Sequence, residues 1–251
     1  MMSSRCTAQI IRFGVLLISV FFMMLGINKV GAQTAGYDWL QWGGDSQHSG
    51  NNTYETRLNI GNVKQLHRLF TVTLPAVVDS PPVYLRGAKT ASGTKDLLFM
   101  TTKPGHLVAV DARTGAQVWI ADHTVSNCLV NNGNTPKDVP QIPCWTTSAP
   151  AIDPNKQYVY SYGLDGYIHK HQVGDGTEIK EDGWPEQITL KPWTDKSSSG
   201  LTLVTAKNGI SYLYANSSGY PMPDPGDWGD YQGRVTAINL TDGTQKVGSP
   251  Q

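Results

Sequence analysis

A repeated segment is the feature that most constrains how this chain folds. Each copy contains a glycine, a strand-like run of five or six residues, and a turn that closes on a second glycine ten positions later. The copies begin at Gly105, Gly166 and Gly233, and they close at Gly115, Gly176 and Gly243. Units of about 60 residues, each built from a few short strands, cannot bury both of their faces alone, so neighbouring units must stack.

Short runs with strand character follow one another between turn signals, and no helical stripe is longer than two turns. These runs are residues 69–74, 96–102, 106–112, 158–163, 167–173, 201–206, 211–216 and 234–240. Asp165-Gly166 and Asn208-Gly209 are typical of primed hairpin turns. We therefore expect six to eight strands in antiparallel meanders. Radial stacking of four-stranded meanders predicts an all-β chain, an incomplete β-propeller of about three to four blades.

Several repeat residues have predictable structural roles. Asp111 and its counterpart Asn239 can accept hydrogen bonds from the backbone of the following turn, in which Thr114 lies. The closing glycines suit a left-handed corner. Trp119 is expected to wedge one blade against the next. Its register is broken in the other copies, where Trp184 is a possible substitute.

The first 32 residues have the layout of a secretory signal peptide. Arg5 and Arg12 precede an apolar run at 13–27, and small residues end the segment before Gln33. A retained anchor is the alternative, but the run is shorter than the roughly 20 residues of a spanning helix. We expect a signal peptide at 1–32, a propeller domain at 33–251 without a membrane span, and a secreted or periplasmic protein.

Export would leave Cys128 and Cys144 in an oxidising compartment, which favours a disulfide between them. The loop between them is rich in Asn, Pro and Gly and has no period, so it cannot hold itself by packing. A link of this span contributes roughly 3 kcal/mol in the loop-entropy account. The alternative, a metal site, needs further ligands nearby.

Residues 109–119, AVDARTGAQVW, resemble the docking motif of the repeats in pyrroloquinoline-quinone (PQQ) enzymes. Residues 39–45 and 59–70 resemble the stretch that leads into the first blade of quinoprotein alcohol dehydrogenases and related exported propellers. The resemblance implies a propeller of seven or eight four-stranded blades. Because this chain has residues for three to four, we expect it to be part of a longer protein.

The resemblance also implies what a dehydrogenase of this family would need: PQQ over the central channel, Ca²⁺, an Asp base and an adjacent cysteine pair. Here the two cysteines are sixteen positions apart, and Trp228 stands where the metal-ligating Glu is expected. Its neighbours Asp227 and Asp230 are candidate cofactor-site ligands, because Ca²⁺ accepts any oxygen ligand. Sequences of this kind are, however, first of all turns.

His169 and His171 are candidate metal ligands, because residues two apart on a strand share a face. The alternative is packing within a blade, since no third ligand is evident in the sequence.

The function remains open between two main interpretations, with a propeller hydrolase or lyase as a third, since a fold alone does not determine function. The 20 basic and 20 acidic residues form no basic stripe, which argues against a nucleic-acid partner. We expect a non-catalytic binding or scaffold module, with a protein or small-molecule ligand at loops 127–145 and 217–231. No cofactor is established by this reading. The alternative is a PQQ- and calcium-dependent dehydrogenase of alcohols or sugars, with its remaining site residues beyond this chain.

Overall fold

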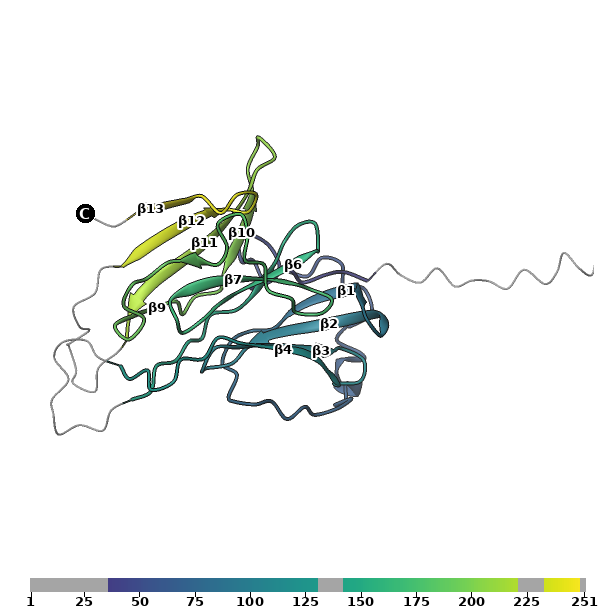
Figure 1. The fold of residues 1–251 in the computed structure, drawn as a ribbon. Coiled ribbons are helices and arrows are strands. Elements are labelled where there is room, and N and C mark those ends of the chain that lie inside the picture. The colour runs from purple at the N-terminus through teal and green to yellow at the C-terminus, as the bar shows by residue number, and fades with distance from the viewer. Residues whose placement is uncertain (1–35, 131–141, 221–232, 249–251) are drawn as a thin grey trace, which may run out of the picture. The chain divides into compact units, whose positions relative to one another are not determined.

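The computed structural model of the protein describes residues 36–130, 142–220 and 233–248 (Figure 1). Contacts divide the chain into two units, Met1–Gly36 and Tyr37–Gln251, and every strand lies in the second unit. The signal peptide predicted at 1–32 and the candidate ligands Asp227 and Asp230 lie outside the described residues. No helix of the described part is long and apolar enough to cross a membrane.

Three four-stranded antiparallel sheets, here called blades 1 to 3, follow one another along the chain (Figure 1). Blade 1 contains β1 (Val83–Thr90), β2 (Gly93–Thr101), β3 (His106–Asp111) and β4 (Gln117–Asp122). Blade 2 contains β5 (Ala151–Ile152), β6 (Tyr158–Tyr162), β7 (Tyr167–Gln172) and β8 (Glu186–Gln187). Blade 3 contains β10 (Thr202–Thr205), β11 (Ser211–Gly219), β12 (Arg234–Asn239) and β13 (Gln245–Gly248), and β9 (Asp195–Lys196) also pairs with β11. A 3₁₀ turn, η1 (Val63–Gln65), precedes them. The predicted all-β partial propeller of four-stranded blades is confirmed.

The predicted strand at 69–74 is wrong, whereas the other seven predicted runs coincide with strands. Residues 69–74 form no strand pairing among the described residues, and two of their side chains pack against the turn between β3 and β4. A Cβ added to Gly115 would lie 2.7 Å from the Phe70 ring and 2.9 Å from Val72. The alternation of apolar and polar residues at 69–74 thus reflects side-chain packing on one face and not hydrogen bonding to a neighbouring strand.

The described part contains thirteen strands, more than the six to eight predicted. Three of the additional strands, β5, β8 and β9, have only two residues each, which is too short for an alternating pattern to be seen. Strand β1 was missed for another reason. Its pairing register shifts between Leu85 and Ala88, where Gly87 has a φ of 64°, and such a bulge breaks the alternation of faces.

The prediction of primed turns at Asp165-Gly166 and Asn208-Gly209 is wrong. Gly166 and Gly209 have φ angles of 90° and 82°, but Asp165 and Asn208 are not among the residues with positive φ. In each loop the glycine N–H donates to the carbonyl three residues earlier, to Gly163 at 3.2 Å in the first loop. A turn that ends in one left-handed glycine is the pattern of longer hairpin loops with a G1 bulge.

The hydrophobic core lies between blades rather than inside each one. One cluster combines Phe99 and Trp119 of blade 1 with Val159 and Val173 of blade 2. The second cluster runs from blade 2 into blade 3, where Leu213 and Ile238 are fully buried. Each sheet therefore depends on its neighbour for burial, as the repeat predicted.

Trp119 joins blade 1 to blade 2. Its indole N–H donates to the Val173 carbonyl at 3.0 Å. A Cβ added to Gly176 would lie 2.7 Å from the same ring, so the indole lies flush against the closing turn of the next blade. At the next junction the Glu186 carboxylate contacts the Gly243 corner instead, while Trp184 is buried against the Tyr160 ring at 5.1 Å.

The closing turns of the repeat have the geometry that their residues favour. The φ angles of Gly115, Gly176 and Gly243 are 76°, 75° and 68°. Asp111 Oδ1 accepts from the Arg113 N–H at 2.9 Å and from the Thr114 N–H at 3.3 Å, and Asn239 Oδ1 accepts from the Thr241 N–H at 2.9 Å. The side chain before each of these two turns therefore holds it closed.

A short N-terminal segment connects the first strands of all three blades. Trp39 pairs with Tyr84 of β1 through two backbone hydrogen bonds, of 2.9 and 2.8 Å. The Leu40 carbonyl accepts from the Ile152 N–H of β5 at 2.7 Å. The Gln41 side chain then bonds the backbone of Leu203 in β10.

Candidate functional site

The two loops that the sequence singled out, 127–145 and 217–231, meet in the structure where they are described. The rings of Trp145 and Tyr220 touch edge to face, with centroids 5.7 Å apart. The Lys196 ammonium nitrogen lies between them, 2.7 Å from the Trp145 ring centroid and 4.8 Å from that of Tyr220. We call Trp145, Lys196 and Tyr220 the loop junction.

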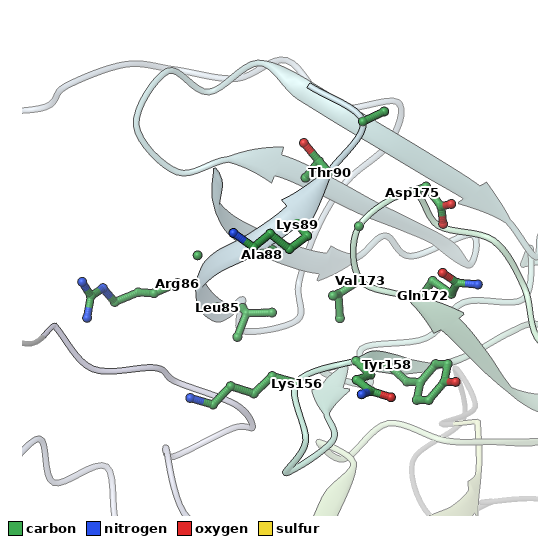
Figure 2. A pocket seen from close by; sticks show the side chains of 14 residues that line it. Leu85, Arg86, Ala88, Lys89, Thr90, Lys156, Tyr158, Gln172, Val173 and Asp175 are labelled. Carbon is green, nitrogen blue, oxygen red and sulfur yellow. The ribbon is translucent and has the colours of Figure 1, made fainter. Parts of the chain in front are cut away.

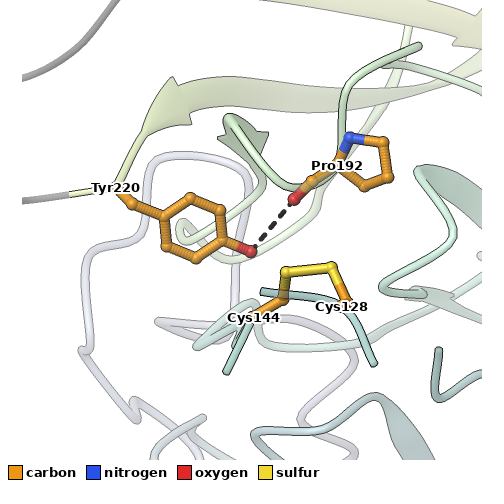
Figure 3. Close-up of a disulfide and its surroundings, with 4 residues drawn as sticks. All are labelled: Cys128, Cys144, Pro192 and Tyr220. Atoms are coloured by element: carbon orange, nitrogen blue, oxygen red, sulfur yellow. Dashed lines mark hydrogen bonds between the residues drawn. A yellow bond between two sulfur atoms is a disulfide. The ribbon is translucent and has the colours of Figure 1, made fainter. Parts of the chain in front are cut away.

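A disulfide holds the base of the first loop. Cys128 and Cys144 are bonded with an S–S distance of 1.98 Å and a Cα–Cα distance of 5.4 Å, as the sequence predicted (Figure 3). The Val130 N–H donates to the Ile142 carbonyl at 2.8 Å, so a short antiparallel pairing continues beyond the bridge. The Tyr220 hydroxyl donates to the Pro192 carbonyl at 3.1 Å close by. The junction is thus fixed from both loops.

Lys196 is a buried cation at the centre of the junction. The residue is 2% exposed. Burial, and then repulsion from Lys103, lower the pKa of the Lys196 ammonium to about 7. Its positive charge faces aromatic rings, which stabilise cations through their quadrupole. Near neutral pH this amine therefore exchanges readily between its charged and uncharged forms.

The histidine candidates lie in a second cluster, at the junction of blades 1 and 2. His169 and His171 are both buried on β7. The structure adds His123, which directly follows β4. Its ring stacks on that of His169 with centroids 3.4 Å apart, and its Nε2 lies 2.8 Å from Nε2 of His171. The sequence contained no local signal for His123, because it belongs to another blade.

Two carboxylates complete this cluster, and the sequence analysis missed both. His169 Nδ1 lies 2.7 Å from Glu178 Oε1, and His169 Nε2 lies 3.1 Å from Asp165 Oδ1. Each ring nitrogen of His169 therefore lies within hydrogen-bonding distance of a carboxylate oxygen. Burial acts to raise the pKa of Glu178, but its bonds to His169 and Lys180 outweigh this and hold that pKa below its usual range. Burial, and then the charges of the neighbouring histidines, lower the pKa of His123 to about 3.

A surface groove between blades 1 and 2 is the third feature of note. It runs between residues 85–91 on one side and residues 156–158 and 172–175 on the other (Figure 2). Two of its cations are already bonded within the protein: Lys156 to Asp38 at 2.6 Å and Lys89 to Thr94 at 2.9 Å. The groove therefore has little charge available from these two side chains.

The described residues do not fit a quinone site with Ca²⁺. In the parts of the chain that the structure describes, one group of three or more His, Cys, Asp or Glu side chains has converging ligand atoms, namely His123, His169 and Glu178. Imidazole is a poor ligand for Ca²⁺, which prefers six to eight oxygens. The cysteines form a bridge across a loop rather than an adjacent pair.

Comparison with known proteins gives the family. The family model "Glucose/ethanol/alcohol dehydrogenase, beta-propeller domain" matches residues 39–245. The chain belongs to this propeller family. Solved structures similar to this PQQ-family propeller domain include a europium-containing methanol dehydrogenase. The identity is 16% and the TM-score is 0.57, over 85% of this chain and 32% of that one.

Two further structures of this kind are quinohemoprotein alcohol dehydrogenases. The protein from Comamonas testosteroni has 17% identity and a TM-score of 0.56, over 84% of this chain and 27% of that one. The protein from Pseudomonas putida HK5 has 18% identity and a TM-score of 0.54, over 83% and 26%. This PQQ-family propeller domain thus spans about a third or less of the length of these relatives. Similarity at this level of identity establishes the fold alone. No curated protein sequence matches the chain.

Proposed function

We propose that this protein is an exported, non-catalytic binding module, and that the loop junction organises its binding face. The observation that carries the proposal is the meeting of the two loops through Trp145, Lys196 and Tyr220 beside the Cys128–Cys144 bridge. Loops fixed on a rigid scaffold are where binding residues concentrate.

The side chains next to the junction favour a protein partner. Leu129 and Ile142 flank the disulfide and are 38% and 42% exposed. Leu190 and Trp193 flank Pro192, whose carbonyl accepts from Tyr220, and they are 74% and 43% exposed. Exposed large apolar side chains gathered on adjoining segments are typical of protein-contact surfaces.

A second candidate function is a PQQ-dependent dehydrogenase, which family membership favours. In that case Asp227 and Asp230, together with residues beyond this chain, would supply the calcium ligands. Among the described residues, the converging ligand group contains two imidazoles, which do not suit Ca²⁺, so this group would not be the calcium site.

A reconstitution experiment separates the two functions. Full-length protein is mixed with PQQ and Ca²⁺, and the absorbance of bound quinone and the dye-linked oxidation of alcohols and sugars are recorded. We expect neither uptake nor turnover. Turnover with an alcohol or a sugar would overturn the binding-module proposal and establish the dehydrogenase.

Site-specific crosslinking tests the binding face. A photoreactive residue is placed at Leu190 in the native host, and a matched one is placed at Ile60, which is 98% exposed and distant in the chain. We expect one defined adduct from position 190 and none from position 60. Equal adducts from both, or none from either, would contradict the assigned face.

Export is tested on the same material. We expect the mass of the mature chain to correspond to a start at Gln33 and the protein to appear in the periplasm or the medium. A chain that retains residues 1–32 in the cytoplasm would contradict this part of the proposal.

A further inference from the structure

We propose that the junction of blades 1 and 2 holds a transition-metal site of the Zn²⁺ class, with His123, His169 and Glu178 as its ligands. One ligand atom from each of these side chains lies within 4.8 Å of the others. Two imidazoles and a carboxylate form a donor set that zinc accepts, with a fourth position left for water. The site shares no residue with the loop junction and does not depend on the proposed binding function.

The hydrogen bonds around the cluster engage one nitrogen of each imidazole with an outer acceptor, which leaves the other nitrogen for an ion. His171 Nδ1 donates to the Gly176 carbonyl at 2.9 Å, so its Nε2 accepts from the Nε2–H of His123. The Nδ1 atom of neutral His123 therefore carries a lone pair. His169 donates through Nε2 to Asp165, while its Nδ1 faces Glu178. Metal-ligating histidines typically donate their other ring N–H to a carboxylate or another acceptor in this way.

Charge and chemistry select the class of ion. Two neutral imidazoles with the carboxylates of Glu178 and Asp165 balance a dication. Lys180 bonds the other Glu178 oxygen at 3.0 Å, but its own side chain is 71% exposed, so solvent screens that pair. Imidazole nitrogen suits Zn²⁺, Co²⁺, Ni²⁺ and Cu²⁺, whereas Ca²⁺ and Mg²⁺ prefer oxygen. The site should therefore discriminate against the calcium ion of the dehydrogenases.

The surrounding backbone closes tightly around the cluster. A Cβ added to Gly163 would lie 2.6 Å from Asp165 Oδ1 and 2.7 Å from His169 Nε2. The His169 side chain is 4% exposed, whereas that of Glu178 is 18% exposed. The imidazoles are thus held in the protein interior, and the carboxylate side is open to an entering ion.

Coordination requires a small rearrangement. Zinc bonds of about 2.0–2.2 Å separate two tetrahedral ligand atoms by about 3.4 Å, so the 2.7 Å contact between His169 Nδ1 and Glu178 must lengthen. A ligand nitrogen must be unprotonated, so any proton on His169 Nδ1 leaves to solvent when the ion binds there. The His123 ring must also tilt out of its parallel stack, since two ligands direct their in-plane lone pairs at one ion from different directions.

Metal binding to the full-length protein, purified without a polyhistidine tag, tests the site. The protein is stripped with a chelator and titrated with Co²⁺, then with Zn²⁺ and separately with Ca²⁺. We expect visible Co²⁺ absorption bands of a four-coordinate site, one ion bound per chain by elemental analysis, displacement by Zn²⁺, and no binding of Ca²⁺ at this site. Absence of a bound ion in the wild-type protein would overturn the proposal.

Variants then assign the ligands. Asp165→Asn should lower Zn²⁺ affinity about 10- to 100-fold, as expected for an outer-shell partner. Glu178→Gln, nearly isosteric, and His169→Gln should lower it further and remove the Co²⁺ bands. His67→Asn, at an exposed histidine outside the cluster, should bind as the wild type does. Thermal melting of the metal-free variants checks folding, and a folded Glu178→Gln variant with wild-type affinity would refute the assignment.

Discussion

The side-chain amide of Gln41 pairs with the backbone of Leu203 in both directions. Its Oε1 accepts from the Leu203 N–H at 2.8 Å, and its Nε2 donates to the Leu203 carbonyl at 3.3 Å. The Gln41 side chain thus bonds both the N–H and the carbonyl of a residue in β10, in the way that a neighbouring strand would. Both residues are buried, so water cannot easily replace these bonds.

Replacing Gln41 with Ala should therefore destabilise the fold by about 1–3 kcal/mol, because the buried N–H and carbonyl of Leu203 lose their partner. Urea unfolding of full-length protein measures this. Gln65→Ala, in the exposed turn η1, is the matched control and should leave stability within about 0.5 kcal/mol of wild type. Equal effects of the two changes would show that the Leu203 pairing contributes little.

Gly176→Ala should weaken the contact between blades 1 and 2. The new Cβ would lie 2.7 Å from the Trp119 ring, at a residue whose φ is 75°. Gly209→Ala is the matched control, because its φ is 82° and a Cβ there meets nothing within 4 Å. Both variants bear the left-handed strain, so we expect Gly176→Ala to lose about 1–3 kcal/mol more through overpacking. Chemical denaturation of the two variants gives the difference, and identical midpoints would contradict the docking role of Trp119.

Removing the disulfide should lower the free energy of unfolding by roughly 3 kcal/mol, because the open loop is freer in the unfolded chain. The double variant Cys128→Ser, Cys144→Ser is compared with wild type by urea unfolding, each with and without reductant. We expect reductant to lower the wild-type midpoint and to leave the double variant unchanged. A wild-type midpoint insensitive to reductant, with the bridge shown to be open, would argue against a stabilising role.

The buried Lys196 should make stability depend on pH. Its pKa is about 7 in the folded protein against an ordinary value of 10.5. Between these two values the unfolded chain holds a proton that the folded chain has released, so stability rises with pH by up to about 1.4 kcal/mol per unit. Below pH 7 both forms are protonated and the dependence ends.

Lys196→Met should remove this slope and raise stability near neutral pH, and urea unfolding between pH 6 and 10 measures it. Lys207→Met, at an exposed lysine of the β10–β11 turn, is the control and should keep the wild-type slope. A wild-type slope in the Lys196→Met variant would mean that another group titrates in this window.

The blades were predictable because their signal is local. Runs such as 106–112 are short and continuously apolar between turn signals, as strands buried on both faces are. The glycine at 115 or 176 indicates a left-handed corner that few other residues adopt. Residues 69–74 show the limit of an alternating pattern, since alternation states that one face is buried but not that a partner strand lies alongside.

The candidate sites were predictable only in part. Export and loop composition predicted the Cys128–Cys144 pair. The two long inserts were predicted as binding loops, but their contact through Trp145 and Tyr220 was not. His169 and His171 were visible as neighbours on one strand, but His123 reaches them from blade 1. Trp119 was predictable as a contact between blades because it belongs to a local repeat motif. His123 has no such motif, and its position depends on how the sheets stack.

The segment 39–41 also has a consequence for the order of assembly. Gln41 precedes its partner Leu203 by 162 residues. At the usual 5–20 residues per second of synthesis, Gln41 waits roughly 8 to 32 seconds for the strand that it bonds. Contacts between such distant residues form late, because a long loop must close first. The segment of the propeller that is synthesised first is therefore among the last to complete its hydrogen bonds. Until then, its unpaired polar groups must be kept from bonding to other molecules.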